Sequence, residues 1–287
     1  MTITDLTAES TSRTLTTDDG ELHYHEAGEG PPLLLLHGSG PGVSGWANFA
    51  GNLPLFAQHF RTLVLDLPGF GRSHPVEGSP VLAAPGAVVA FLDALGLERT
   101  AMVGNSLGGG VVAGLAANHP DRVSRLVTIG GVGIPFFSAT PAEGIIRLVD
   151  FVEDPTRGRL VEWMRSMVFD PAVLTDDFVE SRWAAASDPE ALSAIRQMYS
   201  REMLEIIRPL MLGNPDTLGM LGRIKAPTLL TWGRDDRVAP LDGAIAPLRL
   251  IPRCELHVFP DCGHWAMIER KEEFESVVLS FLLRDVG

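Results

Sequence analysis

One stretch of ten residues decides how this chain folds: Thr100-Ala101-Met102-Val103-Gly104-Asn105-Ser106-Leu107-Gly108-Gly109. Its first four residues are typical of a buried strand, and residues 107–119 have the spacing of a helix that ends at Pro120. Ser106 lies between them, with glycine two positions before it and two positions after it. Side chains at those two positions would collide with the neighbouring strand and helix, so the pattern predicts a tight, strained turn. Such a turn holds a serine hydroxyl above the sheet, beside the amino end of the helix.

Outside this stretch, short apolar runs alternate with segments of helical spacing. Strands are predicted at residues 33–36, 62–66, 125–129, 228–232 and 255–259, and further helices at residues 87–95 and 274–283. This alternation indicates the α/β class, with a mostly parallel central sheet and helices on both faces. The polar residues 1–19 are expected to form a loose arm next to an edge strand near residues 22–25.

Residues 135–215 differ from the rest because their apolar residues recur at helical spacing and no strand-like run is obvious. We expect this block to be a helical lid inserted into a core that consists of residues 1–134 and 216–287. Ligands of open parallel sheets bind at the carboxyl ends of the strands, so the lid should cover those ends. Trp163, Met164 and Met167 are candidates for the wall of a pocket there, or for the core of the lid.

Composition and charge exclude several classes of function. The chain has 287 residues, of which 45% are hydrophobic, and its formal net charge of −13 disfavours binding to nucleic acid or an anionic membrane. The amino-terminal residues lack the pattern of a secretory signal, and no apolar run reaches the length of a membrane span. Cys254 and Cys262 have no metal-ligand spacing, and we expect them to stay reduced. The sequence predicts a cytoplasmic protein with no metal and no cofactor.

A histidine loop near the end of the chain supplies a general base for Ser106. His264 follows the predicted strand at residues 255–259 and lies between Gly263 and Trp265. A loop at the carboxyl end of a parallel strand places the imidazole above the sheet, on the side to which the serine hydroxyl points. His264 is therefore the best candidate among eight histidines.

The acid that would orient this histidine comes from the loop after the strand at residues 228–232. Asp236 is the candidate that accepts the imidazole N–H and stabilises the imidazolium. The adjacent Asp235 competes for this role on spacing alone, and Asp242 is a weaker third candidate. Serine, acid and histidine in this chain order are typical of the α/β-hydrolase fold.

A serine nucleophile also requires two backbone N–H groups that stabilise the developing oxyanion. One is expected from Leu107, the residue after the nucleophile. The other is expected from Ser39, in the glycine-rich turn after the strand at residues 33–36.

Several segments together resemble the meta-cleavage product hydrolases, a family that hydrolyses carbon–carbon bonds in aromatic and steroid-ring degradation. These segments are His37-Gly38-Ser39-Gly40-Pro41-Gly42-Val43-Ser44-Gly45-Trp46-Ala47-Asn48, Gly104-Asn105-Ser106-Leu107-Gly108-Gly109, Ser181-Arg182-Trp183, Trp232-Gly233-Arg234-Asp235-Asp236-Arg237-Val238 and Cys262-Gly263-His264-Trp265. The resemblance favours Asp236 over Asp235 as the triad acid. The chain departs from the family in having Ser39 where many members have glycine, and Leu107 where methionine is common.

The resemblance also implies a set of substrate-binding residues. They are Gly40, Asn48, Asn105, Arg182 and Trp265. Arg182 would bind the substrate carboxylate, since a protein of net negative charge needs a local cation for an anion and a guanidinium fits a carboxylate. The two asparagines would bind the 2-oxo or enol oxygen, or the carboxylate, and Trp265 would form a wall beside the dienoate.

The reaction implied by the resemblance is hydrolysis of 2-hydroxy-6-oxo-hexa-2,4-dienoates, which are small anions. The enol is first ketonised, so that the carbon beside the scissile bond is protonated before it leaves. The C6 ketone is then attacked by Ser106, with His264 as the group that moves the proton. The family further implies a homodimer or a larger homo-oligomer.

Other functions are compatible with the same triad. A carboxylesterase or lactonase would use it equally well, although it would not need Arg182 and the two asparagines. A non-catalytic ligand-sensing protein would not need all three triad members. A dehalogenase or epoxide hydrolase is disfavoured because those members have Asp at the position of Ser106, and a cofactor-independent oxygenase of this fold is a remote alternative.

Overall fold

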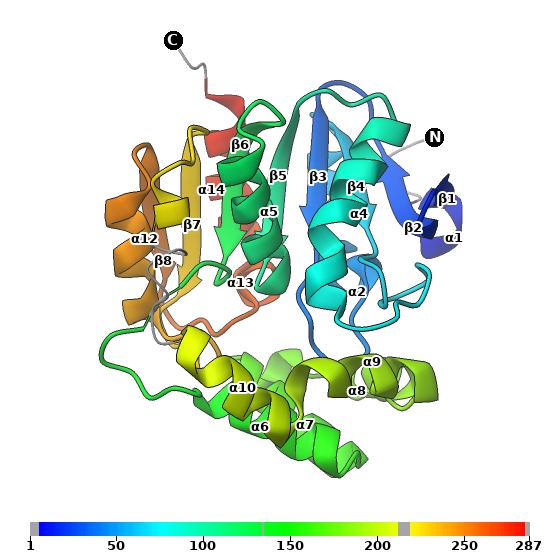
Figure 1. The fold of residues 1–287 in the computed structure, drawn as a ribbon, viewed down its shortest axis with the longest axis vertical. Helices are drawn as coiled ribbons and strands as arrows, with labels where there is room; N and C mark the ends of the chain where they lie inside the picture. The colour runs from blue at the N-terminus through cyan, green and yellow to red at the C-terminus, as the bar shows by residue number, and fades with distance from the viewer. Residues whose placement is uncertain (1–5, 134, 212–218, 285–287) are drawn as a thin grey trace.

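The computed structural model describes residues 6–133, 135–211 and 219–284, and its centre is an eight-stranded sheet (Figure 1). The strands lie in the order β1-β2-β4-β3-β5-β6-β7-β8. Their bounds are β1 Ser12–Thr17, β2 Gly20–Ala27, β3 Pro32–Leu36, β4 Arg61–Leu65, β5 Thr100–Asn105, β6 Val123–Ile129, β7 Thr228–Gly233 and β8 Cys254–Phe259. The pairs β1–β2 and β2–β4 are antiparallel and all the others are parallel, which confirms the predicted α/β class.

The central strands are buried almost throughout because helices cover both faces of the sheet. Every residue of β5 and of β7 is buried, and only the first residue of β3 is not. On one face lie α4 (Pro80–Ala94) and α5 (Leu107–Asn118), and on the other lies α14 (Lys271–Leu283) (Figure 1). The shorter helices of the core are α1 Ala8–Thr11, α2 Gly45–Phe49, α3 Leu53–Phe56, α12 Ile245–Leu250 and α13 Ala266–Glu269.

A group of helices between β6 and β7 lies across the carboxyl ends of the parallel strands (Figure 1). They are α6 Glu143–Glu153, α7 Arg157–Met167, α8 Asp176–Ala186, α9 Pro189–Tyr199 and α10 Arg201–Met211. We call them the lid helices. This arrangement agrees with the predicted helical insertion. The proposed boundaries after residues 134 and 215 lie outside the described residues, and the division into three segments stays a prediction.

The amino-terminal arm is more ordered than its composition suggests. Residues 12–17 form β1, which pairs along its whole length with β2, so the expectation of a loose arm is wrong for this segment. The two strands are joined by a two-residue turn, since Thr17 pairs with Gly20. Threonine suits an edge strand with one exposed face, and a polar sequence of this kind is easily mistaken for a loop.

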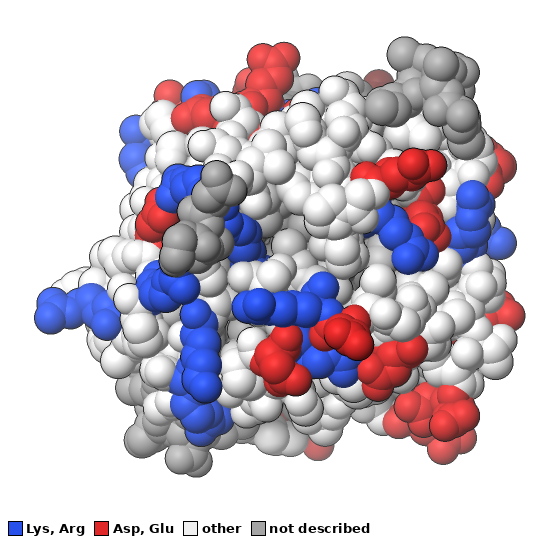
Figure 2. All heavy atoms as spheres, turned by 90° about the horizontal axis from the view of Figure 1, so that it is seen from above, with Lys and Arg blue, Asp and Glu red and all other residues white. Residues whose placement is uncertain are grey.

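Charged side chains of both signs are interspersed on the face opposite the lid helices (Figure 2). Ion pairs such as Arg122–Asp93 and Arg284–Glu255 neutralise some of them. In the described ranges, no helix has both the length and the apolar character that a membrane span requires. Cys254 and Cys262 are both free thiols.

Candidate active site

The turn between β5 and α5 holds Ser106 in a conformation that L residues rarely adopt. Its φ is +50° and its ψ is −113°. A Cβ atom on Gly104 would lie 2.3 Å from the carbonyl oxygen of Gly108, and one on Gly108 would lie 2.4 Å from that of Leu36. The crowding predicted for the two flanking positions is therefore present, and it explains why both are glycine.

His264 and Asp236 form a buried pair close to this turn. His264 Nδ1 lies 2.7 Å from Asp236 Oδ2, and both side chains are about 1% exposed. The other carboxylate oxygen, Asp236 Oδ1, accepts hydrogen bonds of 2.8 Å from the backbone N–H groups of Val238 and Ala239. The carboxylate is thus held on both sides and fixes one ring orientation of the histidine.

The other two candidate acids lie elsewhere. Asp235 pairs with Arg234 at 3.1 Å. Asp242 accepts hydrogen bonds of 2.8 Å from the N–H groups of Phe136 and Phe137, so it holds the loop that precedes the lid helices. Of the three candidate acids, only Asp236 contacts His264 in the described part of the chain.

Gly130 is part of this arrangement and was not predicted from the sequence. Its φ is +55°, and a Cβ atom there would lie 3.0 Å from His264 Nδ1 and 3.1 Å from Asp236 Oδ2. A side chain at the residue after β6 would therefore be strained by its backbone conformation and would push the Asp–His pair out of place by a few tenths of an ångström. The only signal in the sequence is the glycine pair at positions 130 and 131, directly after a predicted strand.

Ser106 and His264 border one small cavity beneath the lid helices. Its volume is about 30 Å³, which is room for little more than one or two water molecules. Of the predicted site residues, the cavity wall also includes Ser39, Gly40, Asn48, Asn105, Arg182 and Trp265. No hydrogen bond between Ser106 Oγ and His264 is present among the described residues, as is common for such pairs without substrate.

Two predicted residues do not border the cavity. Asp236 lies behind His264, and Leu107 is the first residue of α5. The role predicted for Leu107 requires only its backbone N–H. Among the hydrogen bonds of the described chain, neither this N–H nor that of Ser39 has a protein acceptor, so both are free to bind an oxyanion.

Arg182 is a buried cation without a counter-ion. It is 3% exposed, and its only hydrogen bond to a described residue is a long one of 3.5 Å to the carbonyl oxygen of Pro41. Its guanidinium lies 5.5 Å from the ring centres of both Phe178 and Trp265. No acidic side chain pairs with it in the described part of the chain. Burial lowers the pKa of Arg182 to about 10, so it is still charged at neutral pH. An unpaired buried charge is costly, and a bound anion would remove that cost.

The two predicted asparagines are held by hydrogen bonds beside this cation. Asn48 Nδ2 donates to Asn105 Oδ1 at 3.2 Å, and Asn105 Nδ2 donates to the carbonyl oxygen of Ile129 at 3.1 Å. Both residues are at most 5% exposed. Their amides are thus fixed in a cavity that has one cationic end.

The lid helices complete the cavity with mostly apolar residues. They are Ile145, Leu148, Trp163, Met167 and Tyr199, together with Val238 from the core. Of the lid residues predicted for either a wall or a core, Trp163 and Met167 border the cavity, whereas Met164 is buried away from it. Tyr199 was not predicted, and its hydroxyl lies 2.6 Å from Ser39 Oγ. The chain past Arg196 has no motif that could have indicated it.

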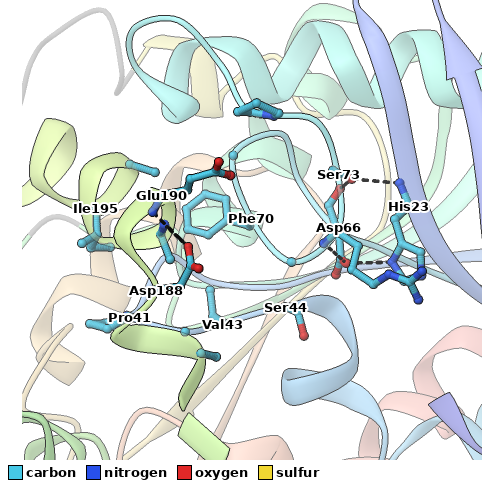
Figure 3. Close-up of a pocket in the computed structure, with 18 of the residues that line it drawn as sticks. His23, Pro41, Val43, Ser44, Asp66, Phe70, Ser73, Asp188, Glu190 and Ile195 are labelled. Atoms are coloured by element: carbon cyan, nitrogen blue, oxygen red, sulfur yellow. Dashed lines mark hydrogen bonds and ion pairs between the residues drawn. The ribbon is translucent and has the colours of Figure 1, made fainter. Parts of the chain in front are cut away.

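A larger cavity of about 690 Å³ lies on the other side of the turn at residues 40–43 (Figure 3). Ile195 of α9, Phe70 and His23 contribute to its wall, and Gly40 and Val43 border both cavities. None of Ser106, Asp236 and His264 borders the larger one, so its size does not make it the better candidate for the chemistry.

Comparison with known proteins agrees with this fold. A family model described as alpha/beta hydrolase fold matches residues 31–271. The 2-hydroxy-6-oxo-6-phenylhexa-2,4-dienoate hydrolase of Burkholderia cepacia is 35% identical over 98% of this chain and 99% of its own. A 2-hydroxy-6-oxononadienedioate/2-hydroxy-6-oxononatrienedioate hydrolase of Pseudomonas putida is 39% identical over 98% of this chain and 99% of its own.

A solved structure shows the same likeness in three dimensions. The meta-cleavage product hydrolase CumD of Pseudomonas fluorescens IP01, solved as a variant with bound acetates, has a TM-score of 0.85. The match covers 94% of this chain and 97% of that one at 28% identity. On the fold, the arrangement of the site and this full-length similarity, the chain belongs to the α/β-hydrolase fold family and, within it, to the meta-cleavage product hydrolases.

Proposed function

We propose that this protein is a serine-dependent hydrolase that cleaves a carbon–carbon bond in 2-hydroxy-6-oxo-hexa-2,4-dienoates. One observation carries the proposal: Arg182, a buried cation that no acidic side chain of the described residues pairs with, borders the same cavity as Ser106 and His264. An enzyme for neutral esters gains nothing from such a group, whereas a substrate with a carboxylate at one end pairs with it. The names of the relatives describe substrates of this class.

Binding would place the substrate in one orientation. Its C1 carboxylate pairs with Arg182, and the oxygen on C2 accepts a hydrogen bond from an asparagine amide, for which Asn48 and Asn105 are placed. The flat dienoate lies against Trp265 and the backbone of Gly40. This orientation directs the C6 carbonyl toward Ser106. The cavity is smaller than such a substrate, so the lid helices must move outward to admit it.

Ketonisation is the first chemical step. The 2-hydroxyl loses its proton and C5 gains one, with His264 as the group that carries it. The product has a carbonyl at C2, conjugated with the C3–C4 double bond. This carbonyl can accept the electron pair of the bond that breaks later, which is why the step must come first.

Carbon–carbon cleavage follows by attack of Ser106. His264 takes the hydroxyl proton, Ser106 Oγ bonds to C6, and the oxyanion is held by the backbone N–H groups of Ser39 and Leu107. When the carbonyl re-forms, the C5–C6 bond breaks and its electrons pass to the oxygen on C2, which takes the proton that His264 holds and leaves the imidazole neutral. This releases 2-hydroxypentadienoate and leaves the acyl group on Ser106. Water activated by His264 then releases the carboxylic acid.

Arg182→Ala tests this proposal against the esterase alternative. We expect kcat/KM for the dienoate to fall by about 10- to 100-fold, the loss typical of a charge-assisted hydrogen bond, with hydrolysis of p-nitrophenyl acetate nearly unchanged. Arg157→Ala is the matched control, because Arg157 also lies in the lid but pairs on the surface with Glu180. Equal losses on both substrates would mean that Arg182 serves the structure rather than the substrate.

Two further predictions stay open to test. The protein is expected to be cytoplasmic and to form a homodimer or larger homo-oligomer. Activity with C6-phenyl and C6-carboxyethyl dienoates, compared side by side, would identify the acyl group that the cavity accepts.

A further inference from the structure

The hydroxyl pair between Ser39 and Tyr199 joins the lid to the turn that is proposed to bind the oxyanion. Tyr199 is the last residue of α9, and Ser39 follows β3 in the turn at residues 38–42, which we call the oxyanion turn. The two residues are 160 positions apart, and both border the cavity that contains Ser106. Their contact therefore forms only when α9 lies over the carboxyl ends of the strands.

Few hydrogen bonds hold the oxyanion turn near Ser39, and one of them, from the Val43 N–H to the Gly40 carbonyl oxygen at 3.2 Å, lies beyond it. Ser39 has glycine on both sides, and a glycine peptide has many accessible conformations. On one side of the turn, His37 Nδ1 bonds to the carbonyl oxygen of Gly38 at 2.6 Å. On the other side, the contact from Arg182 to the Pro41 carbonyl oxygen is long, at 3.5 Å. At Ser39 itself, the phenol of Tyr199 is the partner of the side chain.

From this geometry we propose that Tyr199 is a positioning residue, which aims the backbone N–H of Ser39 at the oxyanion by holding the Ser39 side chain. The inference rests on the proposed function of the site. Tyr199 neither attacks nor transfers a proton in this account. It acts through Ser39, and only in the closed arrangement of the lid helices.

The chemistry of the phenol fits this role. Either hydroxyl can donate in this contact, and a phenol is the stronger donor of the two. Burial raises the pKa of Tyr199 more than its hydrogen bond with Ser39 lowers it, so the phenol stays neutral across the physiological range. Among the described lid residues on the cavity wall, only Arg182 and Tyr199 have a charged or hydroxyl group. The others are apolar or, in the case of Trp163, have an indole.

Other hydrogen bonds also join the lid helices to the core. Because those bonds do not involve Tyr199, its role is limited to the oxyanion turn. At the end of α7, the N–H of His264 donates to the carbonyl oxygen of Met167 at 2.7 Å. Glu269 accepts hydrogen bonds of 2.6 Å from the N–H groups of both Gly263 and Phe169. These bonds fasten α7 to the histidine loop without Tyr199. Loss of the phenol hydroxyl should therefore disturb the oxyanion turn and leave the His264 side of the site in place.

Tyr199→Phe removes only the hydroxyl and is the central test. We expect kcat to fall by about tenfold on the dienoate and by a similar factor on p-nitrophenyl acetate, with KM changed less than about threefold. This is less than the 10²–10³ lost when an oxyanion donor is removed outright, because the N–H of Ser39 is still present. The matched control is Tyr24→Phe, since Tyr24 is the other tyrosine of the chain and packs against Phe91 in the core.

A double-mutant cycle separates positioning from a general effect on folding. Ser39→Ala should cost about as much as Tyr199→Phe, and the double variant should cost no more than either, because both remove one hydrogen bond. Thermal unfolding of Tyr199→Phe and Tyr24→Phe should differ little. Additive losses in the cycle, or a wild-type kcat in Tyr199→Phe, would overturn the inference.

The two substrates also distinguish this role from substrate binding. If Tyr199→Phe raises KM for the dienoate and leaves the ester reaction unchanged, Tyr199 binds the substrate and the inference is wrong. If the wild-type protein hydrolyses the ester but not the dienoate, the proposed function fails. The positioning role can then still be judged on the ester alone, since the ester requires the same oxyanion turn.

Discussion

Two buried Asp–His pairs occur in the described part of this protein, and only one of them lies beside a strained serine. His264 and Asp236 are 2.7 Å apart, and His23 and Asp66 are 2.8 Å apart, with all four side chains at most 2% exposed. A serine also contacts the histidine of the second pair. Ser12 Oγ lies 2.8 Å from His23 Nε2, whereas no hydrogen bond joins Ser106 to His264 in the described residues.

The difference lies in the backbone around each serine. Ser12 is in an extended strand, with a φ of −62°, and its chain neighbours offer no glycine turn. Ser106 has a φ of +50° and precedes a helix, at a point where the N–H groups of Leu107 and Ser39 have no acceptor among the described residues. A hydrogen-bonded Ser–His–Asp series is therefore not enough to identify a nucleophile. The turn that exposes the hydroxyl and supplies the oxyanion donors is the stronger criterion.

The largest expected effect separates the two serines directly. Ser106→Ala should lower kcat on the dienoate by about 10⁴-fold or more, because no other group can form the acyl intermediate, while the substrate still binds. Ser12→Ala should leave kcat within about twofold of wild type. Loss of dienoate absorbance under saturating substrate measures both. Comparable losses in the two variants would show that backbone geometry does not distinguish the two serines.

Replacement of the two aspartates by asparagine should affect different properties, namely kcat in one case and stability in the other. Asp236→Asn should lower kcat by about 10³- to 10⁴-fold with little change in stability, because the amide favours the wrong tautomer of His264. Both backbone donors of Asp236 bind Oδ1, which an amide retains. Asp66 instead accepts backbone N–H groups on both oxygens, from Gly45 at 2.6 Å and from Arg72 at 3.0 Å, so an amide would turn its NH2 group toward a donor. Asp66→Asn should therefore lower the free energy of unfolding by about 2 kcal/mol and leave kcat of the folded protein within a few-fold. Urea unfolding gives the free energy of unfolding of both variants, and steady-state kinetics gives their kcat. A catalytic loss in Asp66→Asn together with a loss of stability in Asp236→Asn would refute the roles assigned to the two aspartates.

A further expected effect, which involves stability alone, is a pH dependence near the second pair. Desolvation, and then the neighbouring His23, lower the pKa of His25 from 6.5 to about 4. Because the folded state disfavours protonated His25, neutral His25 contributes fully to the free energy of unfolding above pH 6.5. This contribution is lost as the pH falls from 6.5 toward 4. Between pH 7 and pH 4.5 the loss from His25 should be about 2 to 3 kcal/mol. Urea unfolding of wild type and His25→Asn at the two pH values measures it, and an equal acid loss in both proteins would rule out His25 as the source.

The sequence predicted those parts of the site that local motifs encode. Ser106 and His264 each follow a strand within a glycine-marked segment, so the pattern alone is enough to place their loops at one edge of the sheet. Gly130 was missed because its role is to leave space for the side chains of two other loops. Tyr199 was missed because amphipathic spacing identifies a lid helix without showing which residue faces the core.

The fold was predictable to a similar extent and for the same reason. Strands buried on both faces, such as β3 and β5, are continuous apolar runs, and these were found. The strand β1 was missed because an edge strand of serine and threonine resembles a polar loop. The pairing of His23 with Asp66 joins β2 to the loop after β4, and no spacing rule connects residues on separate elements.

Product analysis of the wild-type reaction tests the central claim most directly. Purified protein is mixed with 2-hydroxy-6-oxo-6-phenylhexa-2,4-dienoate, absorbance is followed, and the products are separated. We expect loss of the dienoate chromophore, with benzoate and 2-hydroxypentadienoate formed in equal amounts. An unchanged chromophore for this and for C6-alkyl dienoates, in a protein that readily hydrolyses p-nitrophenyl acetate, would contradict it.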